Sequence, residues 1–120
     1  MRLYITDEQK EDLSFDIITM TTSEFNSIKN HPFISSSKFD EVVIELNENI
    51  QLGFIRPLMA TTRIIPKIVG DITPHIISIL CELYKERAAE IRYTYIRNKD
   101  TFGEYLEKMK KEFCWEQFYN

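Results

Sequence analysis

The sequence predicts an α+β fold: a short antiparallel β-sheet from the N-terminal half, packed on a C-terminal antiparallel helix pair. Two observations predict it. In residues 41–55, apolar and polar side chains alternate on both sides of a turn, as in a β-hairpin. From Thr73 onward, apolar side chains recur at helical spacing in two runs. With 120 residues we expect a single domain, 1–120, with a sheet-rich part (1–72) that includes one short helix and a helix pair (73–120).

The composition is that of a globular protein, since 43% of the residues are hydrophobic and 28% are charged. The first ten residues include acidic side chains and lack the apolar run of a signal peptide. No stretch approaches the roughly 20 consecutive apolar residues that span a bilayer. We therefore expect a soluble protein without membrane contact, in the cytoplasm, or in the host cytoplasm if the protein is viral.

Cysteine and isoleucine usage both bear on the origin of the protein. Cys81 and Cys114 have no C-x-x-C spacing, so we expect free thiols in a reducing compartment. Seventeen isoleucines beside three glycines and four prolines are typical of an AT-rich genome, such as those of many phages, viruses and low-GC bacteria. This bias favours a viral or phage accessory protein.

The net charge of −4 is unevenly distributed. Residues 1–50 carry ten acidic and four basic side chains, whereas residues 51–120 carry nine acidic and eleven basic ones. A protein that coats nucleic acid usually presents a strongly basic face, so the overall acidity argues against that class. A local basic patch in the second half of the chain stays open.

The beginning of the chain predicts two strands. Arg2–Ile5 is interpreted as a short strand, and Phe15–Met20 is rich in β-branched residues. Between them, Thr6 and Gln9 form a T-x-x-Q capping box, so residues 7–13 are interpreted either as a helical turn or as an acidic loop.

A short helix is expected to follow. Thr21 and Glu24 form a capping box, in which the side chain of each residue accepts a hydrogen bond from the backbone N–H of the other. The helix must end near Asn30, because Pro32 disfavours the helical conformation of His31.

The clearest strand is Asp40–Leu46, in which alternate side chains are apolar. After the turn Asn47–Asn49, alternation resumes through Ile50 and Phe54, and this return completes the predicted hairpin. Residues 56–72 leave two alternatives, a further short strand or a packed irregular loop, because prolines interrupt an otherwise apolar stretch.

Thr73 as N-cap, with Pro74 at the first helical position, predicts the start of a helix. Its apolar stripe consists of Ile76, Ile77, Leu80, Leu83, Tyr84, Ala88, Ile91 and Tyr95. A break at residues 98–100 and a capping box from Thr101 begin the next helix. The stripe of that helix consists of Phe102, Leu106, Met109 and Phe113. So short a break predicts antiparallel neighbours.

Few residues could carry catalysis or hold a metal. The two histidines are His31 and His75, and His75 lies about 240° around its predicted helix from Cys81, so the two cannot bind one ion. A Cys–His pair could form only by tertiary folding, and we expect both cysteines to be small buried hydrophobes. The sequence predicts no catalytic residue, no metal site and no cofactor; an enzyme ranks third among the function classes.

Basic residues mixed with tyrosine predict an alternative function, the binding of nucleic acid or another anion. Arg92, Tyr93, Arg97 and Lys99 lie at the end of the long predicted helix. Tyrosine rings can stack on bases while arginines hold phosphate. Cations at a helix C-terminus also stabilise the helix dipole, which accounts for them without any ligand.

Surplus apolar residues predict the leading function, the binding of another protein or of a second copy of this chain. Outside the main stripes lie seven candidate contact residues: Ala89, Tyr93, Ile96, Arg97, Trp115, Phe118 and Tyr119. Exposed apolar patches mark partner surfaces, and Trp, Tyr and Arg dominate interface energetics. The competing interpretation is that these residues pack on each other or on the sheet. We expect a non-enzymatic module of the inhibitor, immunity or anti-defence type that occludes a partner surface, with a homodimer among the alternatives.

Overall fold

The computed structural model describes residues 2–7, 17–28, 40–60, 62–113 and 115. The chain forms two compact units. The first consists of Met1–Glu45 and Gln51–Pro66, and the second of Leu46–Ile50 and Lys67–Asn120. Each unit is described by itself.

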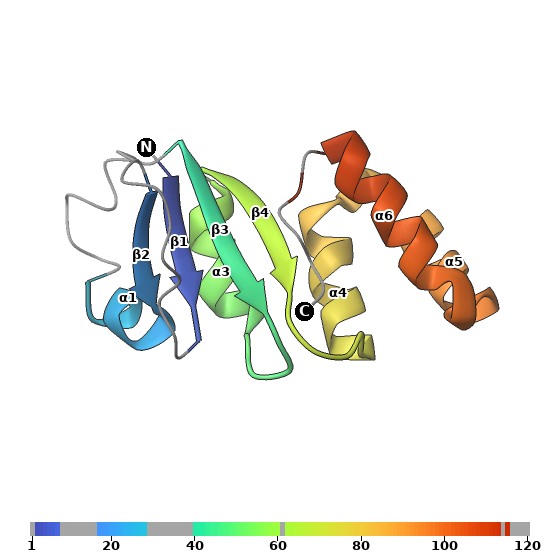
Figure 1. The fold of residues 1–120 in the computed structure, drawn as a ribbon, viewed down its shortest axis with the longest axis horizontal. Coiled ribbons are helices and arrows are strands. Elements are labelled where there is room, and N and C mark those ends of the chain that lie inside the picture. The colour runs from blue at the N-terminus through green and yellow to red at the C-terminus, as the bar shows by residue number, and fades with distance from the viewer. Residues whose placement is uncertain (1, 8–16, 29–39, 61, 114, 116–120) are drawn as a thin grey trace. The chain divides into compact units, whose positions relative to one another are not determined.

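A four-stranded sheet is formed by β1 (Arg2–Thr6), β2 (Ile17–Thr21), β3 (Glu41–Leu46) and β4 (Arg63–Ile68), in the order β2-β1-β3-β4 (Figure 1). Its strands are parallel. Along β1, Arg2 pairs with Ile17 on one side and with Glu41 on the other, and both registers advance in the same direction. The predicted antiparallel sheet is therefore wrong.

The predicted hairpin is also wrong, because the residues of its second strand form a helix. The strand and the turn form: Asn49 N–H donates to Asn47 Oδ1 at 2.8 Å. The residues that should return as a strand instead form helix α3 (Leu52–Met59), which buries Ile55 and Leu58. Apolar residues there fit a helical spacing as well as an alternating one, and only tertiary contacts select between them. Of the two alternatives for residues 56–72, the short strand is the one that forms, as β4.

Helices make the crossovers that parallel strands require. Helix α1 (Thr22–Ile28) follows β2, and α3 connects β3 to β4. The predicted capping box of α1 is confirmed, because Thr21 Oγ1 accepts from Glu24 N–H at 3.1 Å. The two helices meet through Phe25 and Phe54, whose ring centroids are 5.2 Å apart in an edge-to-face arrangement.

The core of the first unit is built on the two central strands. In β1 the consecutive residues Leu3 to Ile5 are all buried, as are Val42 to Ile44 in β3. Tyr4, Val43 and Ile65 form a buried cluster across three strands. Burial of consecutive residues means that both faces of these strands are covered, which is typical of a parallel sheet.

Helices α4 (Pro74–Leu83), α5 (Ala88–Arg97) and α6 (Phe102–Phe113) make up most of the second unit. The predicted start is confirmed, since Thr73 Oγ1 accepts from Ile76 N–H at 3.3 Å. The predicted continuity from residue 74 to 97 is wrong: the helix breaks at Tyr84, which has φ −120° and ψ 63°. The break directs the Tyr84 ring toward Phe113, at a centroid distance of 4.8 Å.

The predicted antiparallel arrangement holds for α5 and α6. Arg87, just before α5, forms an ion pair with Glu112 near the end of α6. Tyr95, near the end of α5, packs against Phe102 at the start of α6, with ring centroids 5.3 Å apart. No helix within the described ranges is long and apolar enough to cross a membrane.

Candidate partner-binding surface

Helix α5 exposes a row of apolar side chains, Ala89, Tyr93 and Ile96, which we call the α5 seam. Tyr93 is 64% exposed and Ile96 is 68% exposed, and Ala89 is exposed as well. These residues are four and three positions apart, so they line one side of the helix. The expectation that this row lies outside the packed stripe is met.

The opposite side of α5 supplies its packing. Ile91 is fully buried, and Tyr95 is half-buried against Phe102. These contacts hold the helix in place, so its packing does not depend on Tyr93 or Ile96. Ile28, at 36% exposed, is the other large apolar side chain on the surface of the described residues.

One edge of the seam carries opposite charges at its two ends. Glu90 lies toward the start of α5 and forms an ion pair with Arg87 at 3.0 Å. Arg97 lies at the end of α5, is exposed, and forms no ion pair within the described parts of the chain. The Glu90 carboxylate also acts on Tyr105, whose pKa is raised to about 12, first by burial and then by this charge.

Trp115 does not belong to this surface. It is 6% exposed, and its ring centroid lies 5.0 Å from that of Tyr84. The expectation that Trp115 is an exposed contact residue is therefore wrong, because the bend at Tyr84 creates an aromatic pocket for it that no local pattern indicates. Phe118 and Tyr119 lie outside the described residues.

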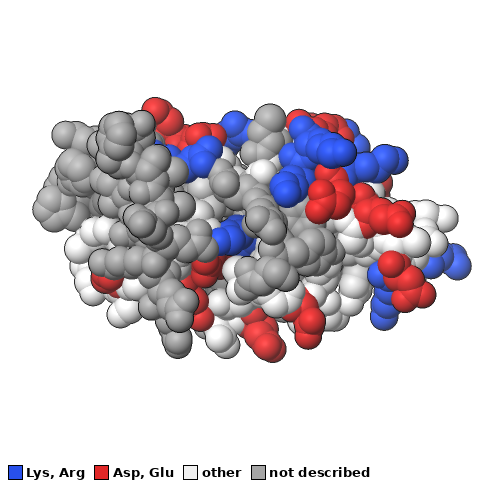
Figure 2. All heavy atoms as spheres, viewed as in Figure 1, with Lys and Arg blue, Asp and Glu red and all other residues white. Residues whose placement is uncertain are grey.

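The residues predicted to bind nucleic acid do not share one side of helix α5. Arg92 and Arg97 are exposed, but they lie on different flanks of α5, and Lys99 places its Nζ 5.3 Å above the Tyr95 ring. Figure 2 shows Lys and Arg side chains interspersed with Asp and Glu over the region of α6. The face drawn there therefore has no uniform positive field of the kind that follows a phosphate backbone.

The described histidine and cysteine are both engaged within the fold. His75 Nε2 forms a hydrogen bond with the Ile50 carbonyl, which can only accept, so this nitrogen is the donor. Cys81 is buried, and burial raises the pKa of its thiol, an effect that Arg92 partly offsets. His31 and Cys114 lie outside the described residues. Within the described ranges, no three His, Cys, Asp or Glu side chains converge as metal ligands would.

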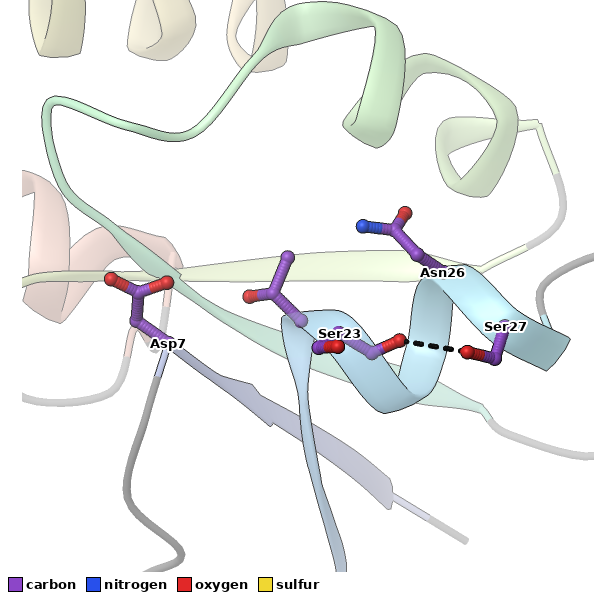
Figure 3. A pocket seen from close by; sticks show the side chains of 5 residues that line it. Asp7, Ser23, Asn26 and Ser27 are labelled. Carbon is purple, nitrogen blue, oxygen red and sulfur yellow. Dashed lines mark hydrogen bonds between the residues drawn. The ribbon is translucent and has the colours of Figure 1, made fainter.

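A second feature, which sequence reasoning did not indicate, is a polar hollow of about 630 Å³ at the carboxyl ends of β1 and β2 (Figure 3). It is lined by Asp7, Thr22, Ser23, Asn26 and Ser27. In parallel sheets, ligands bind at this edge. The lining offers hydroxyl, amide and carboxylate groups for hydrogen bonding, but no thiol, imidazole or amine among the described residues that could act as a nucleophile or anion ligand.

Comparison of the chain with protein-family models, with curated proteins and with solved structures found no match. Its function is therefore inferred from its own residues.

Proposed function

We propose that this protein is a non-enzymatic protein-binding module that contacts its partner through the α5 seam. The observation that carries the proposal is the exposure of Tyr93 and Ile96, at 64% and 68%, on a helix whose packing depends on other residues. Large apolar side chains exposed side by side mark partner surfaces. Tyrosine and arginine are residue types that dominate interface hot spots, and Arg97 lies at the edge of the seam near Tyr93.

The helix that carries the seam is packed against α6 near both of its ends, which favours binding. Helix α5 is fixed at its start by the Arg87–Glu112 ion pair and at its end by the contact of Tyr95 with Phe102. A surface that is already ordered loses little conformational entropy when a partner binds. Tyrosine has few rotatable bonds, so ordering Tyr93 costs less than ordering a long flexible side chain.

The class of action we propose is occlusion of a partner surface, as by a small inhibitor, immunity or anti-defence protein. Residues 1–50 carry a large excess of acidic side chains. An acidic surface is drawn to a basic one, such as the nucleic-acid-binding site of another protein, and speeds the encounter.

Site-specific photo-crosslinking tests the proposal. A photoreactive phenylalanine analogue is placed at Tyr93, and the same analogue at Ile28 serves as the matched control, because Ile28 is an exposed apolar residue elsewhere. After irradiation in native lysate and purification, we expect a discrete adduct from position 93 that is absent from position 28. Equal labelling from both positions, or none from either, contradicts the proposed surface.

A second candidate function is the binding of single-stranded nucleic acid by Arg92, Tyr93, Arg97 and Lys99. The observation in its favour is that Arg92, Tyr93 and Arg97 are all exposed near the end of one helix. Fluorescence anisotropy with a labelled oligonucleotide tests it. Affinity that falls steeply with added salt supports this function, and absence of binding at low salt excludes it.

A further inference from the structure

We infer that the partner of the α5 seam is a second copy of this chain, with the two α5 helices packed antiparallel about a two-fold axis. The inference rests on the proposed protein-binding function and names its partner. It is argued from the charges that border the seam, which are arranged so that the surface complements itself.

The relevant charges are Glu90 and Arg97. They are seven residues apart, which on an α-helix is about 20° short of two full turns, so they border the same flank of the seam. Their Cα atoms are separated by roughly 10 Å along the axis, with Tyr93 between them. One flank therefore carries a negative end and a positive end.

With a two-fold axis perpendicular to the helices, each flank faces the same flank of the other copy, which runs in the opposite direction. With the axis beside Tyr93, Glu90 of each copy lies opposite Arg97 of the other, and two equivalent ion pairs form. A parallel pair would instead turn the flank of Glu90 and Arg97 toward the other flank of α5, which carries Arg92. Within α5 that flank offers no carboxylate to Arg97, so only the antiparallel arrangement pairs both Glu90 and Arg97 with opposite charges.

The apolar residues complete the pattern. Ala89, Tyr93 and Ile96 lie beside the charged flank and cover a narrow strip, as in a two-helix contact rather than a broad docking face. Glu90 also pairs with Arg87 in its own chain, but one carboxylate can accept from two guanidinium groups, as Glu41 does from Arg2 and Arg63. The internal ion pair is therefore compatible with a contact to the second copy.

The strip is small, and the dimer is accordingly weak. Stable complexes usually bury about 800 Å² on each partner, and a contact centred on one ten-residue helix falls below that area. We expect a dissociation constant of roughly 100 µM and rapid exchange between monomer and dimer.

Charge exchange across the two-fold axis tests the arrangement. In Glu90→Arg, positions 90 and 97 are both positive; in Arg97→Glu, both are negative. Each variant alone should repel its own copy and dimerise at least about tenfold more weakly than the unchanged protein. Mixed together, the two variants should associate, because every 90–97 contact then joins opposite charges. Sedimentation equilibrium of each protein and of the equimolar mixture measures this.

Three further proteins control the test. Tyr93→Ala should weaken self-association by a similar factor, and Ile28→Ala should leave it unchanged. Circular dichroism monitors the fold throughout. If Glu90→Arg unfolds because it removes the ion pair with Arg87, Glu90→Gln replaces it. Its own dimer should be weakened, and it should associate with Arg97→Glu better than with itself, because one Arg97–Glu90 ion pair forms in that mixture.

A monomer at concentrations up to about 1 mM overturns the inference. So does a mixture of the two charge variants that associates no better than either alone. If the protein is a monomer but position 93 still crosslinks to another protein, the self-association fails and the protein-binding function stands. If neither self-association nor a crosslink from position 93 is found, both fail.

Discussion

Arg2, the first residue of β1, and Glu41, the first residue of β3, form an ion pair with 3.0 Å between Nη2 and Oε1. The other carboxylate oxygen of Glu41 lies 3.2 Å from Nη1 of Arg63, the first residue of β4. One carboxylate therefore joins the amino ends of three neighbouring strands. This arrangement is possible only because the strands are parallel, since only then do their amino ends meet at one edge.

We predict that Glu41→Gln lowers the free energy of unfolding by about 1 kcal/mol, because it weakens three charge-assisted hydrogen bonds, from Arg2 and Arg63, to a partly exposed side chain. Urea denaturation monitored by circular dichroism measures the change. Glu48→Gln, at an exposed turn position, is the control and should leave the midpoint where it is. Equal effects of the two substitutions would argue that Glu41 does not link the strands.

The two aromatic residues Trp115 and Tyr93 should respond oppositely to truncation. Trp115→Ala removes a buried ring and should lower the free energy of unfolding by about 3 kcal/mol or more. Tyr93→Ala removes a largely exposed ring and should change it by less than about 0.5 kcal/mol. Thermal and urea unfolding compare them. A large loss for Tyr93→Ala would show that its ring belongs to the core, and the α5 seam would then not be a free surface.

Tyr105 should make the protein less stable in strong alkali. Its folded-state pKa is about 12, above the ordinary value of 10.0, so the folded protein retains this proton longer than the unfolded chain does. Stability due to this group is thus complete below pH 10 and falls as the pH rises toward 12. Urea midpoints measured across this window should decline less steeply for Tyr105→Phe than for the unchanged protein. An ultraviolet titration detects directly the high pH at which the Tyr105 phenolate forms.

The buried thiol of Cys81 should react slowly in the folded state. Burial limits access, and the raised pKa reduces the fraction of reactive thiolate. Alkylation under native conditions followed by peptide mass spectrometry should leave Cys81 unmodified, and the same treatment in denaturant should label it. Prompt native labelling of Cys81 would contradict its placement in the core.

Local signals in the sequence determined the helix starts and several element positions. The capping residues Thr21 and Thr73 begin helices as predicted, because an N-cap acts on backbone groups only two or three residues away. The α5 seam was also visible, since helical spacing alone separates Tyr93 and Ile96 from the packed side. These features depend on interactions within one or two turns of chain.

The tertiary structure decided what depends on distant segments. The orientation of β1, β2 and β3 follows from how the crossovers return, and the alternation of apolar residues in one strand is compatible with either orientation. Residues 52–59 form α3, in which helical spacing places both Ile55 and Leu58 on the buried side. Trp115 became core because Tyr84, far away in the sequence, turns its ring toward it. Short-range patterns specify where an element begins and which side is apolar, but the partner that covers that side is chosen by packing of the whole chain.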